Sequence, residues 1–303
     1  MQKLKGIGIT VAALLFAGLP LCAQSTGQIL VTVQSKHNGD KVAPLSATDL
    51  QIKIEGKQVA IKDLHPATDE QVELVLLLDA TNGRDMTLLN DLASLIRVLG
   101  PKVRCSVAYM ISGQAVFAGP LTNDPMTVLH QLRVQTLPSS SAYFSIADLA
   151  RHWPSSAQHV RREVIMVTDG VEPYMNGFFD PSNQYVATAI DEASRAGLTV
   201  HTMFWIRTAS NLTANSYYFV AQQYMQLVSD GTGGSNYGTG NTAPVTLLPF
   251  LEDVLRKMNN QYRVVFELPA GIKTNQGLDM SVKNNNKQDQ IIAPKRFVAV
   301  QAH

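Results

Sequence analysis

Residues 72–83 read VELVLLLDATNG, and this stretch decides the fold. A run of valine and leucine ends abruptly at Asp79, which predicts a fully buried strand that delivers a carboxylate to the edge of a sheet. Residues 164–170, VIMVTDG, repeat the arrangement and end in Asp169. Ligand crevices of open α/β folds lie at the carboxyl ends of parallel strands, so we expect the two aspartates side by side on one rim.

Apolar strands and amphipathic helices alternate from residue 73 to residue 261. This pattern predicts an α/β fold with a Rossmann-like parallel sheet covered by helices on both faces. Gly197 is expected to close one of the helices as a C-cap. The expected helices are 86–99, 126–134, 145–152, 184–196, 217–228 and 247–258, and the other expected strands are 104–111, 163–168 and 198–205.

Two β-rich segments flank the α/β region. The predicted division is residues 24–70 as a β-rich segment, 71–261 as the α/β domain and 262–303 as a second β-rich segment. Neither flank has enough strands to bury a core alone. We therefore expect the two flanks to pack together as one small β-sandwich, into which the α/β domain is inserted.

The composition excludes some classes of function. The chain has 303 residues and a formal net charge of +1, which argues against nucleic acid as a partner, because phosphate neutralisation needs a basic face. The length allows one or two domains with a sizeable core. Cys105 lies in an expected buried strand and reads as a small core hydrophobe rather than a reactive thiol.

Residues 1–23 have the pattern of a secretory signal peptide. Lys3 and Lys5 precede a short apolar stretch, and Ala23 is a small residue at the expected cleavage site. A lipid anchor on Cys22 is the alternative, although the bulky Leu21 fits that signal badly. We expect an exported protein, periplasmic or extracellular, without a membrane span in the mature chain.

These landmarks resemble the von Willebrand factor type A domain over residues 72–261. The flanks are similar to those of a secreted bacterial group related to that domain. Residues 227–234, LVSDGTGG, look like the group's motif at a helix end, and residues 260–263, NQYR, look like its junction after the last helix. The resemblance implies a Rossmann-like fold and a role in adhesion or protein binding.

In the resembled family the crevice often holds a divalent cation in a metal-ion-dependent adhesion site. Asp79, Thr81 and Asp169 match its ligand positions, whereas Gly83 replaces a hydroxyl and Tyr143 stands where a threonine belongs. The resemblance therefore implies at most a degenerate site for Mg²⁺ or Mn²⁺. The alternative is that no metal binds and that the two aspartates cap backbone NH groups of the following loops.

Aromatic residues follow the second aspartate. Tyr174, Phe178 and Phe179, together with Tyr143, are the predicted partner-binding residues beside the crevice. The alternative reading of the loop is local packing. Residues 231–240, GTGGSNYGTG, lack the strand-then-helix context of a phosphate loop, and we expect a mobile surface loop there.

Three functions follow, of different classes. The first is a binding or adhesion module that meets a protein partner at the rim. The second is a metal-free scaffold subunit of an envelope assembly. The third is an enzyme with paired carboxylates, which we do not favour, because the scattered histidines form no zinc pattern and no G-x-S-x-G elbow is present.

Overall fold

The computed structural model describes residues 26–36, 42–79, 86–133, 140–175, 177–206, 214–238, 240, 244–286 and 289–300. A six-stranded sheet forms the centre, in the order β10-β9-β8-β5-β6-β7. All neighbouring pairs are parallel except β6 and β7, which are antiparallel. The strands are β5 (Val72–Asp79), β6 (Val103–Ile111), β7 (Gln114–Phe117), β8 (Arg161–Thr168), β9 (Leu198–Phe204) and β10 (Asn236–Tyr237).

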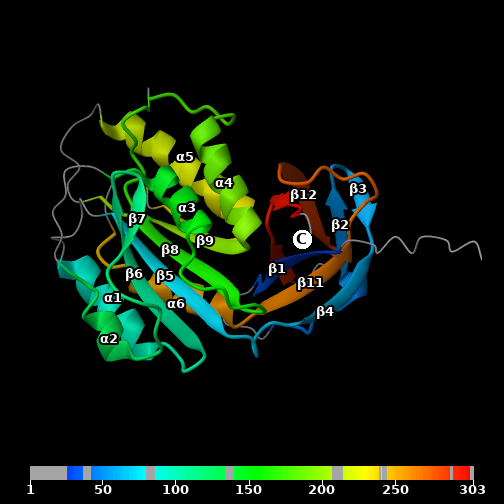
Figure 1. The fold of residues 1–303 in the computed structure, drawn as a ribbon, viewed down its shortest axis with the longest axis horizontal. Helices are drawn as coiled ribbons and strands as arrows, with labels where there is room; N and C mark the ends of the chain where they lie inside the picture. The colour runs from blue at the N-terminus through cyan, green and yellow to red at the C-terminus, as the bar shows by residue number, and fades with distance from the viewer. Residues whose placement is uncertain are drawn as a thin grey trace, which may run out of the picture.

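Helices cover both faces of this sheet, as Figure 1 shows. One layer consists of α3 (Ala142–Arg151), α4 (Gln184–Ala196) and α5 (Ala214–Thr232), and the other of α1 (Met86–Val98), α2 (Pro125–Leu129) and α6 (Leu248–Met258). Each layer has its own apolar cluster against the sheet. Every residue of β5 is buried because the strand is central and covered on both sides.

The chain's flanks build two antiparallel sheets beside the α/β part (Figure 1). One sheet has the order β13-β1-β11-β4, and the other has the order β14-β12-β2-β3. They share one apolar cluster, so the fold class predicted from the sequence is confirmed, sandwich included. The strands are β1 (Thr26–Ser35), β2 (Leu50–Ile54), β3 (Lys57–Val59), β4 (Ile61–Pro66), β11 (Gln261–Glu267), β12 (Gly277–Asn284), β13 (Asp289–Ile292) and β14 (Arg296–Val298), and a 3-10 turn, η1 (Ala47–Asp49), precedes β2.

The expectation of a mobile surface loop at residues 231–240 is wrong in part. Residues 231 and 232 belong to α5, and β10 pairs with β9 as the edge strand of the sheet. Position 234 requires glycine, because a Cβ there would lie 2.0 Å from the carbonyl oxygen of Val200. The glycines allow the end of α5 to approach the sheet closely.

Helix ends follow the predicted chemistry where polar caps are present. At the start of α4, the Asn183 side chain accepts hydrogen bonds from the backbone NH groups of Tyr185 and Val186. Gly197 closes the helix with a φ of 68°, as predicted. The helix expected at 126–134 is shorter than predicted, because α2 ends at Leu129.

Candidate functional site

The carboxyl ends of β5 and β8 meet at one rim of the parallel sheet. The two strands are adjacent and parallel, with Leu78 opposite Val167. At their ends, Thr168 Oγ1 donates a hydrogen bond of 2.9 Å to Asp79 Oδ2. Asp169 follows Thr168 directly, so the two predicted aspartates come together from separate parts of the chain.

Asp169 is held by the loop that it begins. Its Oδ1 accepts a hydrogen bond of 2.9 Å from the backbone NH of Val171. Burial raises the pKa of Asp169 to about 6, and the nearby charge of Asp79 adds to the shift. The rim therefore concentrates negative charge in a poorly solvated place.

Glu172 is a third acidic residue of the rim, and the sequence reasoning missed it. Its carboxylate accepts hydrogen bonds from Ser141 Oγ at 2.5 Å and from the backbone NH of Tyr143 at 3.2 Å. The Glu172 carboxylate thus lies at the first turn of α3, where the backbone NH groups have no hydrogen-bond partners within the helix. Burial raises the pKa of Glu172 to about 7, and Asp79 contributes to the shift.

The structure corrects the prediction that Tyr143 contacts a partner. Tyr143 is completely buried in the apolar layer between the sheet and α3, α4 and α5. Its ring packs edge-on against Tyr224, and its hydroxyl donates to the carbonyl oxygen of Ala221. The periodicity of α3 turns this position inward, so Tyr143 belongs to the core.

The other predicted aromatic residues follow β8 in the loop that leads to α4. Tyr174 packs against Phe144 and Tyr185, and Phe179 packs against Tyr224. The side chain of Phe178 is 78% exposed. The loop thus combines local packing with exposed aromatic surface, and its role in partner binding stays a prediction.

A pocket opens on the same rim, and we call it the Glu172 pocket. Its volume is about 470 Å³. Three segments form it: the turn after β6, the start of α3 and the loop after β8. Its walls include Ser112, Gly113, Ser141, Phe144, Glu172 and Tyr174.

The described side chains do not fit a complete Mg²⁺ site. In the part of the chain that the structure describes, no three His, Cys, Asp or Glu residues lie close enough together to hold a metal ion. Asp79 and Asp169 each already accept a hydrogen bond from a neighbouring protein group. Thr81, the third predicted ligand, lies outside the described residues. We therefore derive no step through a metal.

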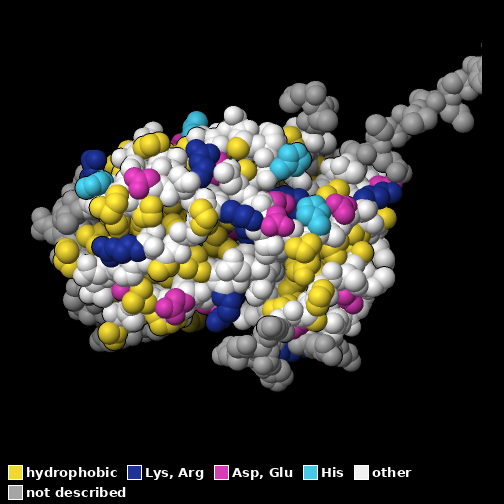
Figure 2. Space-filling model, turned by 90° about the horizontal axis from the view of Figure 1, so that it is seen from below, with side chains coloured by type: hydrophobic (Ala, Val, Ile, Leu, Met, Phe, Trp, Pro, Cys, Tyr) yellow, Lys and Arg dark blue, Asp and Glu magenta, His cyan; other side chains and the backbone are white. Residues whose placement is uncertain are grey.

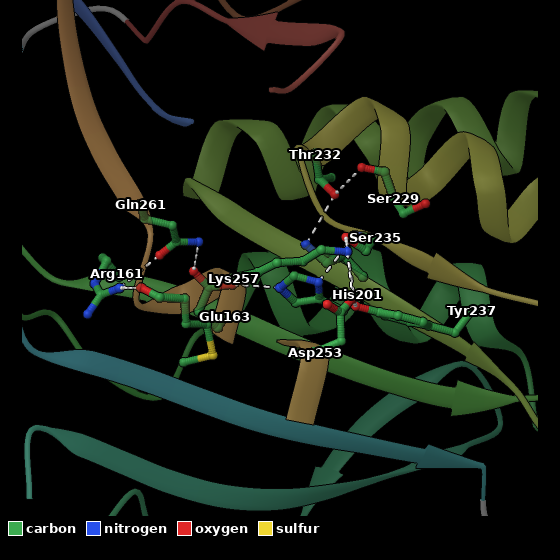
Figure 3. A network of polar contacts seen from close by, with 12 residues as sticks. Arg161, Glu163, His201, Ser229, Thr232, Ser235, Tyr237, Asp253, Lys257 and Gln261 are labelled. Atoms are coloured by element: carbon green, nitrogen blue, oxygen red, sulfur yellow. Dashed lines mark hydrogen bonds and ion pairs between the residues drawn. The ribbon is translucent and has the colours of Figure 1, made fainter. Parts of the chain in front are cut away.

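A second polar cluster lies near the amino end of β8, away from the rim (Figure 3). His201 Nδ1 lies 3.2 Å from the backbone NH of Ser235, which can only donate, so His201 Nε2 carries the proton and donates to Glu163 at 3.1 Å. Gln261 Nε2 also donates to Glu163, and Arg161 donates to Gln261. His201 Nε2 thus ties β9 to β8, His201 Nδ1 ties β9 to the residue before β10, and Gln261 ties β11 to β8, so the cluster is structural.

Lys257 and Ser235 are in contact in the same cluster, but they are not arranged as a base and a nucleophile. Lys257 Nζ donates to Ser235 Oγ at 2.9 Å and lies 2.7 Å from Asp253 Oδ2 (Figure 3). Ser235 Oγ thus accepts from Lys257, whereas a nucleophilic serine has to donate its proton to a neighbouring base.

Charges of both signs are scattered over the face of the molecule shown in Figure 2. On the face shown in Figure 2, lysine and arginine side chains alternate with acidic and apolar ones, and the described atoms of that face form no continuous basic area. None of the described helices combines the length and the apolar character that crossing a membrane requires.

The sequence matches no known protein-family profile and no curated protein. Similar solved structures include von Willebrand factor A domains. The BatB protein of Bacteroides thetaiotaomicron has 14% identity and a TM-score of 0.42 over 62% of this chain and 98% of its own. The von Willebrand factor domain of the type V pili tip protein Mfa5 of Porphyromonas gingivalis has 12% identity and a TM-score of 0.44, over 63% of this chain and 95% of its own. The pilus adhesin SpaC of Lactobacillus rhamnosus GG has 11% identity and a TM-score of 0.47, over 87% of this chain and 48% of its own.

Proposed function

We propose that this chain is an exported binding module that meets a protein partner at the rim around Asp79, Asp169 and Glu172. The observation that carries the proposal is the pairing of buried carboxylates with accessible aromatic rings at that rim. Sites of this composition, on loops held by a rigid sheet, are typical of recognition surfaces. The partner's contact area would include Phe178 and Phe179.

The aromatic rings supply the apolar part of this surface. Phe144, Phe178 and Phe179 are all partly or largely exposed, and they lie at the start of α3 and in the loop after β8. Large rings with few rotatable bonds contribute contact area at a small entropic cost. The acidic residues beside them supply charge and hydrogen-bond acceptors, which fix the orientation of the partner.

Binding assays with rim variants test this proposal. Asp169→Asn and the double variant Phe178→Ser/Phe179→Ser should each weaken capture of the partner. Gln158→Ala is the matched control, because Gln158 is exposed just before β8, at the opposite end of that strand. Partners retained by both rim variants would favour the alternative role of a scaffold subunit without a ligand at the rim.

Export is a separate part of the proposal, and it rests on the pattern of residues 1–23, which lie outside the described residues. Amino-terminal sequencing of the protein from the producing cells tests it. We expect the mature chain to begin close to Gln24 and the protein to be recovered from the periplasm or the medium. An unprocessed chain in the cytoplasm would contradict export.

A further inference from the structure

The Glu172 pocket has walls that the fold holds in place. The turn between β6 and β7 contains Ser112 and Gly113, whose φ angles are 50° and 80°. Next to this turn, the backbone NH of Ala115 donates to Asp148 Oδ2 at 2.9 Å, which fastens β7 to α3. On the other side, Glu172 is fastened to the start of α3. The pocket is therefore formed before a ligand arrives, which lowers the entropic cost of binding.

The described lining of the pocket presents one acidic group and no positive one. Glu172 is only 2% exposed, and it takes part in no ion pair within the described residues. None of the described residues that line the pocket is lysine, arginine or histidine. When ionised, the buried carboxylate of Glu172 is stabilised by hydrogen bonds and not by an ion pair. A cation that enters the pocket would therefore be attracted electrostatically to it. A carboxylate has about four lone-pair positions, so an additional donor can be accepted beside the protein's own.

Aromatic rings beside the carboxylate favour the same kind of ligand. The ring of Phe144 is 44% exposed and lies in edge contact with Tyr174, with 6.1 Å between the ring centroids. Ring faces attract cations, and arginine also stacks on them through its planar guanidinium group. The walls thus combine a carboxylate with an exposed aromatic ring, and together these select a basic side chain over a neutral apolar one.

We propose that the Glu172 pocket receives a basic side chain of the protein partner, arginine foremost, with its cation against Glu172 and its stem against Phe144. The inference rests on the proposed function, since it names the partner chemistry of the same rim. A volume of about 470 Å³ admits a whole side chain, whereas the described lining residues offer a bare metal ion only one carboxylate. The partner's key group is therefore basic, and it binds without a bridging metal.

Nuclear magnetic resonance titration of the isotope-labelled mature chain tests this inference. The probes are N-acetyl-arginine amide and N-acetyl-citrulline amide, which have nearly the same shape and differ in charge. We expect the arginine probe to shift the backbone NH signals of Gly113 and Tyr143. The citrulline probe should bind about tenfold more weakly or not at all.

Variants assign the effect to the pocket. Glu172→Gln keeps the hydrogen-bond acceptor for Ser141 and should weaken the arginine probe about tenfold. Phe144→Ala should weaken it less, and Phe219→Ala, which removes an exposed ring on α5, should leave it unchanged. Because the comparison of the two probes needs only the unaltered protein, a variant that fails to fold does not block the test.

Three results would overturn the inference: equal binding of the two probes, unchanged arginine binding in Glu172→Gln, or no shift of the pocket signals with either probe. Partner capture that still depends on Asp169, Phe178 and Phe179 would then leave the proposed function standing. Conversely, arginine binding at the pocket without any rim-dependent partner would support the pocket chemistry and contradict the proposed function.

Discussion

Thr168 Oγ1 donates a hydrogen bond of 2.9 Å to Asp79 Oδ2, and this bond joins the ends of two neighbouring parallel strands. Thr168 also accepts from the backbone NH of Gly170 at 3.0 Å, so one hydroxyl orders both the rim carboxylate and the loop behind it. Both side chains are buried, and water does not replace either bond readily.

Replacing this hydroxyl should therefore destabilise the protein. Thr168→Val keeps the shape of the side chain but removes the donor, and we expect the free energy of unfolding to fall by about 1–3 kcal/mol. Urea denaturation measures the change. Thr188→Val on the exposed face of α4 is the control and should have a much smaller effect. If the two substitutions lowered the free energy of unfolding equally, the hydrogen bond between Thr168 and Asp79 would make no specific contribution to stability.

The raised pKa of Glu172 makes stability depend on pH. The folded protein holds this proton up to about pH 7, whereas the ordinary pKa is 4.5. The resulting stabilisation is complete below the ordinary value and is lost as the pH rises through the folded value. We expect this one group to lower the free energy of unfolding by on the order of 2 kcal/mol across that window.

Glu172→Gln cannot ionise, so its stability should decline less between pH 4.5 and pH 7, the two pKa values of Glu172. In this variant Asp169 still makes stability decline as the pH rises. Its contribution is centred at lower pH than that of Glu172, because the pKa of Asp169 is about 6. Urea denaturation across this pH range measures both proteins, and Glu252→Gln at an exposed site of α6 controls for net charge. Parallel curves for the wild type and Glu172→Gln would contradict the burial of an ionisable Glu172.

Divalent metal should not be needed for the function of the rim. The described donors do not form a complete set, so millimolar Mg²⁺ or Mn²⁺ should give no calorimetric heat and no shift in melting temperature. Partner binding should also survive EDTA. A saturable heat that disappears in Asp79→Asn and Asp169→Asn would show instead that Thr81 or water completes a metal site.

The buried cluster around Glu163 should contribute strongly to stability. Glu163 and His201 are almost completely buried, and Glu163→Ala leaves His201 and Gln261 without their shared acceptor. Each buried donor left without an acceptor costs about 1–3 kcal/mol, so we expect the free energy of unfolding, measured by urea denaturation, to fall by about 2–6 kcal/mol. The exposed pair of Lys102 and Asp69 is the matched control, and Asp69→Ala should cause no resolvable change. Similar losses at both sites would refute the structural role of the cluster.

The strands and the rim could be predicted because their signals are local. An apolar run that ends in aspartate marks β5 and β8 directly, and a parallel sheet then brings Asp79 and Asp169 to one edge. The sandwich was predictable because each flank has too few strands to stand alone. These inferences need only the order of residues along the chain.

Other parts of the site depend on contacts between distant segments. Glu172 stands in a loop rich in aromatic residues, and its role follows from Ser141, thirty-one residues earlier. The burial of Tyr143 depends on the phase of α3 against α5, which a serine-rich start of the helix does not reveal. Gly234 is explained only by the approach of the carbonyl oxygen of Val200. The sequence signal for Glu172 was its own position, three places after Asp169 in the loop that follows the second strand.

Site-specific photo-crosslinking in the producing cells tests the central claim most directly. A photoreactive phenylalanine at position 178, which is exposed at the rim, is compared with one at position 158, which lies at the opposite end of β8. We predict a discrete protein adduct from position 178 that is lost in Glu172→Gln, and no such adduct from position 158. An adduct from position 178 that Glu172→Gln leaves unchanged would contradict only the role of the Glu172 pocket. An adduct from position 158 alone, or no adduct from position 178, would contradict a partner-binding rim.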